Sequence, residues 1–142
     1  MGRRVGGWTW VILLVGAVLA VPAGAGGRVH EYVLDNGLRV LVKPDRRAPV
    51  VVSQVWYRVG SSYEHDGITG MSHMLEHMMF KGTETYGPGE FSRLIAAEGG
   101  RENAFTGQDY TAYFQNLASD RLEVSFRLEA DRMAGLRLRE ED

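Results

Sequence analysis

The stretch His73-Met74-Leu75-Glu76-His77 places two histidines four residues apart. On a helix, positions i and i+4 lie one turn apart on the same face, so the two imidazoles could bind one metal ion. Glu76 borders the same patch, and its carboxylate could take a proton from a metal-bound water. The alternative is a structural one, in which two core histidines lie beside a salt-bridged glutamate.

The surroundings of this stretch favour the metal site. From Thr69 to Phe80 the sequence is apolar on nearly every side, and its methionines are expected to pack in the core. We expect a buried helix that begins near Thr69 as N-cap and ends at Gly82. A buried carboxylate needs a partner, which a metal ion supplies. The order H-x-x-E-H is the reverse of the common H-E-x-x-H zinc motif, and imidazole and carboxylate ligands favour zinc.

Two blocks of the sequence resemble the pitrilysin/insulinase family of zinc metallopeptidases. The first runs from Gly70 to Thr83, and the second is Gly99-Gly-Arg-Glu-Asn-Ala-Phe-Thr106, followed by Tyr110-Thr111 and Tyr113. The resemblance covers about residues 29–142. It implies a zinc endopeptidase that cleaves peptides or unfolded proteins. It also implies Zn²⁺ ligands at His73 and His77, with Glu76 activating a zinc-bound water.

The same resemblance assigns a substrate-binding edge strand to Asn103, Ala104 and Phe105, where an extended peptide could add by main-chain hydrogen bonds. An ordinary strand is the alternative. The family's third ligand, a glutamate about 75 residues beyond the second histidine, would fall past Asp142. We therefore expect residues 26–142 to be the N-terminal domain of a longer enzyme, in which homologous domains or a partner subunit close a chamber over the substrate.

Within the chain, four glutamates are candidates for the third ligand: Glu123, Glu129, Glu140 and Glu141. Glu129 is the most interesting because it interrupts the apolar stripe of a predicted helix. That stripe consists of Leu122, Phe126, Met133 and Leu136. The favoured interpretation of Glu129 is structural, either an ion pair with Arg132 or an exposed edge of the stripe.

We expect an α+β fold in which helices pack on a largely antiparallel sheet. Strands are expected at residues 30–34, 38–43, 50–59, 101–106 and 111–117, and helices at 69–82, 88–99 and 119–138. Asn36-Gly37 suits a tight hairpin turn. The strand at 50–59 is apolar on both faces and is predicted to be central. Phe91, Leu94 and Ile95 should share one helix face.

The first 25 residues have the features of a signal peptide. Arg3 and Arg4 precede an uncharged apolar run at 8–21, and Ala23-Gly24-Ala25 is a small-residue cleavage signal. We expect an exported protein, periplasmic or secreted, with cleavage after Ala25. An uncleaved leader, acting as a membrane anchor, is the alternative.

The amino-acid composition excludes several classes of protein and of site. The formal net charge is −2, so no basic surface points to nucleic acid. The chain has no cysteine, which excludes disulfides and cysteine-based zinc sites. S-ribosylhomocysteine lyases resemble this chain only in the H-x-x-E-H helix, and they use a catalytic cysteine. A non-catalytic, peptide-binding subunit of a processing-peptidase-like complex is the remaining alternative.

Overall fold

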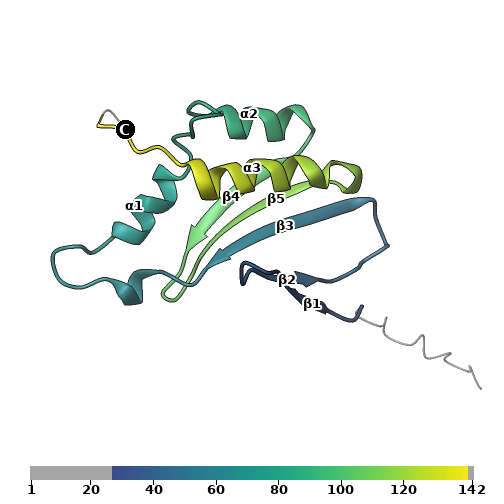
Figure 1. Cartoon of the computed structure of the whole chain (residues 1–142), viewed down its shortest axis with the longest axis horizontal. Coiled ribbons are helices and arrows are strands. Elements are labelled where there is room, and N and C mark those ends of the chain that lie inside the picture. The colour runs from purple at the N-terminus through teal and green to yellow at the C-terminus, as the bar shows by residue number, and fades with distance from the viewer. Residues whose placement is uncertain (1–26, 141–142) are drawn as a thin grey trace, which may run out of the picture. The chain divides into compact units, whose positions relative to one another are not determined.

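The computed structural model describes residues 27–140. The described part of the chain divides into two compact units, residues 27–45 and 46–140. The described elements are antiparallel strands and helices, which confirms the α+β fold class (Figure 1). The predicted signal peptide, residues 1–25, lies outside the described residues. In the described part of the chain, no helix is both long and apolar enough to cross a membrane.

The described part of the first unit is a β-hairpin (Figure 1). Strand β1 (His30–Val33) pairs antiparallel with strand β2 (Arg39–Val42). Gly37 has a φ of 84°, and the Leu38 amide donates to the side-chain oxygen of Asn36 at 3.1 Å. Because glycine adopts a positive φ at little cost, the Asn-Gly pair forms the predicted turn.

The second unit contains a three-stranded antiparallel sheet in the order β3-β5-β4. The strands are β3 (Val50–Tyr57), β4 (Arg101–Thr106) and β5 (Thr111–Ala118). The prediction that the strand at 50–59 is central was wrong, because β5 takes that place. Val52 and Trp56 of β3 are 54% and 51% exposed. An apolar composition thus indicated a strand but not its position in the sheet.

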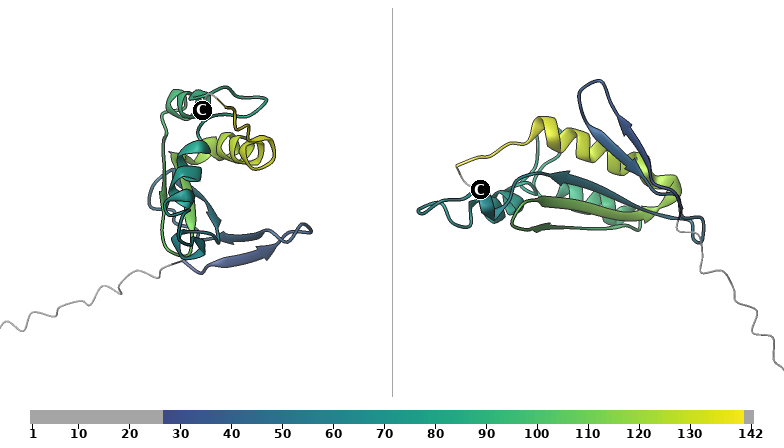
Figure 2. Two further views of the ribbon diagram at one scale, coloured as in Figure 1. Left: turned by 90° about the vertical axis from the view of Figure 1, so that its left-hand side faces the viewer. Right: turned by 90° about the horizontal axis from the view of Figure 1, so that it is seen from below.

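Two helices cover one face of this sheet. Helix α2 (Glu90–Ala97) packs against β4, and α3 (Leu122–Gly135) packs against β3 and β5 (Figure 2). The core between these layers is formed by Phe91, Ile95, Leu117 and Leu128. Phe91 and Ile95 are buried and Leu94 packs against them, which confirms the predicted inner face of α2.

Helix α3 presents a different face to the sheet from the one predicted. Phe126 and Met133 of the predicted stripe are 58% and 42% exposed. The buried positions are Ser125, Leu128, Glu129 and Arg132. The apolar periodicity was misleading because polar side chains occupy the inner face and satisfy one another there.

The buried polar side chains of α3 form a hydrogen-bonded network with Gln115 of β5, in which Nη1 of Arg132 has no hydrogen-bond partner. Arg132 donates to Glu129 at 2.5 and 3.2 Å, and Gln115 donates to the same carboxylate at 2.6 Å. The Ser125 hydroxyl donates to the amide oxygen of Gln115 at 2.8 Å. The Arg132 guanidinium also lies 4.3 Å from the centre of the Tyr113 ring. This network confirms the ion pair of Glu129 with Arg132.

Candidate metal centre

The two histidines lie on helix α1 (Met71–Met78), one turn apart. Their Nε2 atoms are 3.1 Å apart. Two ligands of one tetrahedral zinc ion, each about 2.0–2.1 Å from it, lie roughly 3.4 Å apart. The ring nitrogens therefore already converge on a common point, as the i, i+4 spacing predicts.

Glu76 completes this cluster. The ligand atoms of His73, Glu76 and His77 all lie within 4.8 Å of one another. Glu76 is only 9% exposed, whereas both histidines are exposed. Its Oε2 accepts a hydrogen bond from the hydroxyl of Thr106, the last residue of β4. Helix and sheet thus meet at the carboxylate of Glu76, and no pattern in the sequence indicates the contact with Thr106.

Helix α1 is less enclosed than its sequence predicts. It contacts β4 and the short 3₁₀ helix η1 (Ser61–Tyr63), and Glu76 is its only buried residue. Met71, Met74 and Leu75 are 54%, 59% and 43% exposed, so the expectation of a wholly buried helix and a methionine core was wrong for residues 27–140. Only the face of α1 that packs against β4 and η1 is shielded from solvent, and the remaining faces are exposed.

The start of α1 is capped by a residue that the sequence did not single out. The predicted N-cap, Thr69, is not the cap; Gly70 occupies that position with a φ of 88° and no capping side chain. Instead, Glu64 accepts hydrogen bonds from the amides of Gly70 and Ser72 at 2.7 and 2.8 Å. The Ser72 and Gly70 amides lower the pKa of the Glu64 carboxyl below its usual value. A carboxylate from a preceding loop therefore anchors the helix.

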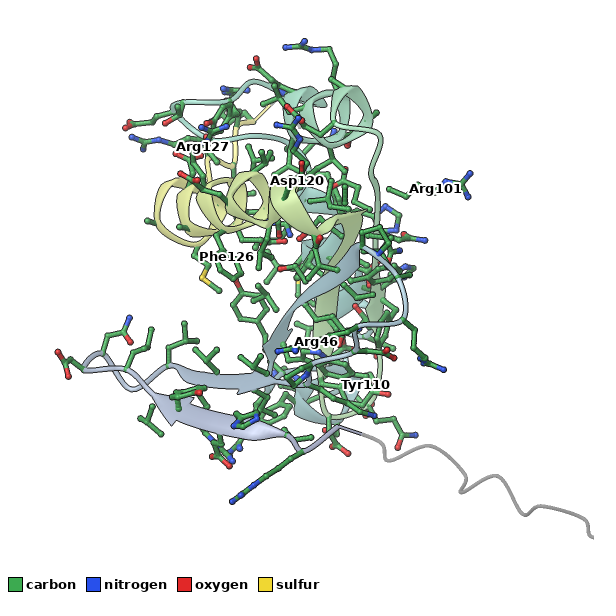
Figure 3. The ribbon with its side chains drawn as sticks, turned by 90° about the vertical axis from the view of Figure 1, so that its right-hand side faces the viewer. Arg46, Arg101, Tyr110, Asp120, Phe126 and Arg127 are labelled. Atoms are coloured by element: carbon green, nitrogen blue, oxygen red, sulfur yellow. The ribbon has the colours of Figure 1, made fainter. Side chains whose placement is uncertain are left out.

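A cavity of about 540 Å³ lies beside the side chains of His73 and Glu76. Its lining includes His73 and Glu76 from α1 and Ala104, Phe105 and Thr106 from β4. Strand β4 is an edge of the three-stranded sheet and pairs only with β5 within it. The structure thus brings Ala104 and Phe105 to the same cavity as His73 and Glu76, whereas His77 does not line it. Asn103 lies on β4 but does not line the cavity, and Arg101 at the start of the strand projects away from the ribbon (Figure 3).

The other candidate ligands are not at this site. Glu129 is engaged with Arg132 and Gln115. Among residues 27–140, the group able to hold a metal consists of His73, Glu76 and His77, without Glu123 or Glu140. Glu141 lies outside the described residues.

Comparisons with known proteins agree with this geometry. The family model described as insulinase (peptidase family M16) matches residues 39–142. The zinc protease PqqE of Helicobacter pylori is 36% identical over 139 residues, covering 92% of this chain and 31% of that protein. The chain thus spans less than a third of this relative's length.

Solved structures show the same likeness. The crystal structure of a protease from Helicobacter pylori matches with a TM-score of 0.78 at 37% identity, over 81% of this chain and 28% of that one. The first half of the periplasmic protease PqqL from Escherichia coli matches with a TM-score of 0.73 at 26% identity, over 80% of this chain and 26% of that one. Together with the family-model match, these likenesses show that the chain belongs to the insulinase family of peptidases.

Proposed function

We propose that this chain supplies the catalytic N-terminal part of an exported zinc endopeptidase that hydrolyses peptides or unfolded proteins. The observation that carries the proposal is the convergence of the His73 and His77 Nε2 atoms, 3.1 Å apart, beside the buried carboxylate of Glu76. The zinc protease PqqE shares 36% identity with the chain.

The donor set fits zinc. Two imidazole nitrogens and a nearby carboxylate are borderline-soft and hard donors of the kind that zinc takes in catalytic sites. When bound, zinc lowers the pKa of a water molecule and polarises a scissile carbonyl. The ion would be held by His73 and His77, together with a ligand from outside residues 27–140.

Residues of this chain would carry out the other two tasks, proton transfer and peptide binding. Glu76 is placed to take the proton of the attacking water and to pass it to the leaving amine. The edge of β4 at Ala104 and Phe105 is placed to bind an extended peptide through main-chain hydrogen bonds, next to Glu76 in the same cavity. Edge pairing reads the peptide backbone, so it accepts many sequences.

A non-catalytic peptide-binding subunit is the competing function. Such a subunit would need the β4 edge but would have no use for a buried Glu76 beside two convergent imidazoles. Zinc content and hydrolysis, measured together, separate the two.

The test is Glu76→Gln in the complete gene product that contains this chain. We expect zinc content to stay and kcat for a fluorogenic peptide to fall by about 100- to 10,000-fold, as expected for loss of a general base. His73→Ala should instead lose the metal. Glu123→Gln, an exposed glutamate on α3, is the matched control. Full hydrolysis by the Glu76→Gln enzyme would overturn the proposal.

We also propose that residues 1–25 are a cleaved signal peptide and that residues 26–142 form the domain. The charged, apolar and small-residue regions follow one another in the required order. The PqqL protease, which the chain resembles in structure, is described as periplasmic. N-terminal sequencing of the exported protein should begin at Gly26, and a start at Met1 would contradict cleavage.

A further inference from the structure

We propose that Thr106 is a positioning residue, whose hydroxyl holds the Glu76 carboxylate back from the metal so that Glu76 serves as a base and not as a ligand. This inference rests on the proposed function. It begins from the hydrogen bond that Thr106 Oγ1 donates to Oε2 of Glu76.

The direction of that hydrogen bond follows from its partners, because a carboxylate oxygen accepts and the Thr106 hydroxyl is the donor. The Thr111 hydroxyl donates its single proton to the carbonyl of Val59 at 2.9 Å, and a carbonyl can only accept. Thr106 Oγ1 lies 3.5 Å from the Thr111 hydroxyl. Of these two neighbours, the Glu76 carboxylate makes the closer contact with Thr106 Oγ1, so the Thr106 proton is directed to Glu76. A hydrogen bond to a charged, largely buried acceptor is stronger than a neutral one.

Thr106 is held in place by the sheet and by a neighbouring loop. It pairs with Thr111 across β4 and β5. The next residue, Gly107, donates its amide to the Tyr110 carbonyl at 2.8 Å and accepts from the Ser61 amide at 3.1 Å. These backbone contacts therefore fix the position of the Thr106 hydroxyl independently of helix α1. Such a fixed donor restrains a side chain that would otherwise choose among rotamers.

Without this restraint, Glu76 has an obvious second position. Its ligand oxygen lies within 4.8 Å of the histidine nitrogens. Closing to the roughly 3.4 Å that separates two ligands of one zinc ion is a movement of about 1.4 Å at most, within reach of a side-chain rotation. Catalytic zinc sites usually have three protein ligands, and only two histidines are present in the cluster. A released Glu76 would therefore coordinate the metal and stop acting as a base.

The test compares Thr106→Val, which keeps the shape and removes the donor, with Thr106→Ser, which keeps the donor. Thr111→Val is the matched control, since it removes the hydroxyl that lies 3.5 Å from Thr106 Oγ1 but leaves the Thr106 donor to Glu76 in place. The first measurement is zinc affinity of the 142-residue chain, by competition with a chelating dye. Because a released Glu76 would supply a third protein ligand, we expect Thr106→Val to bind zinc about tenfold more tightly, and Thr106→Ser and Thr111→Val to match the wild type.

A double variant shows whether the effect passes through Glu76. In a Glu76→Gln background, where no carboxylate is available, Thr106→Val should leave zinc affinity unchanged. In the complete gene product, Thr106→Val should lower kcat about 10- to 100-fold with little change in KM, and Thr106→Ser should restore it.

Three results would overturn the positioning role: unchanged or weaker zinc binding by Thr106→Val, a change in affinity that persists in the Glu76→Gln background, or a Thr106→Ser variant as impaired as Thr106→Val. Failure of the proposed function looks different. In that case the wild-type chain itself would bind zinc no better than a His73→Ala variant.

Discussion

The ion pair of Arg132 and Glu129 offers a sharp test of the fold. Both side chains are enclosed, at 2% and 4% exposed. Arg132→Met removes two of the three hydrogen bonds to the carboxylate and leaves only the one from Gln115, at 2.6 Å. Removing one partner of a buried pair costs about 3–5 kcal/mol, because a buried charge is left uncompensated. We expect a loss in this range, a large part of the ~5–15 kcal/mol that holds a typical domain.

The assay is urea unfolding of residues 26–142, in which Trp56 is the single tryptophan, followed by its fluorescence; Trp56 lies on β3, which packs against α3. Arg93→Met is the matched control, because its ion pair with Glu90 has the same i, i+3 spacing but is exposed. That change should cost less than about 1 kcal/mol. In the double variant Arg132→Met/Glu129→Met, the total loss should be smaller than the sum of the two single losses. If Arg132→Met is as mild as Arg93→Met, the buried pair does not exist as described.

Two further predictions concern the loops around α1 and the sheet. Because the folded pKa of Glu64 is lowered, its stabilisation of α1 is present above the ordinary value of 4.5 and is lost as the pH falls through the lower, folded value. The NMR chemical shift of the Ser72 amide should follow this titration in the wild type and should not titrate in Glu64→Gln. A titration midpoint at or above pH 4.5 would contradict the cap. A β-carbon on Gly60 would lie 2.3 Å from the Gly107 carbonyl oxygen, so Gly60→Ala should destabilise by about 1–3 kcal/mol in urea. Gly87→Ala is its control, since only a side-chain atom 4.0 Å away is met there, and equal effects would refute the clash.

Local patterns in the sequence predicted the local parts of the molecule. The hairpin turn at Asn36-Gly37 depends on the φ of one glycine, and the spacing of His73 and His77 depends on one helical turn. Both are properties of fewer than six consecutive residues. The strands and helices were found for the same reason, with ends that differ by a few residues.

Features that depend on distant partners could not be predicted in this way. Thr106 reaches Glu76 across 30 positions of sequence, and Glu64 caps a helix that begins seven residues later. The inner face of α3 was misassigned because Glu129 is buried only where Gln115 and Arg132 satisfy it. Strand order likewise depends on which strands meet: the apolar β3 lies at an edge of the sheet, and β5 lies at its centre.

The division between α1 and β4 has a consequence for biogenesis. The imidazole pair needs only one helical turn, which forms in roughly a microsecond or less, whereas the Thr106 contact needs a sheet built from non-local pairings, which assembles far more slowly. An emerging chain therefore presents a metal-capturing pair before its carboxylate is aligned. Under the proposed function, the protein binds its metal ion before it can hydrolyse peptides, and it becomes active only when the sheet is complete.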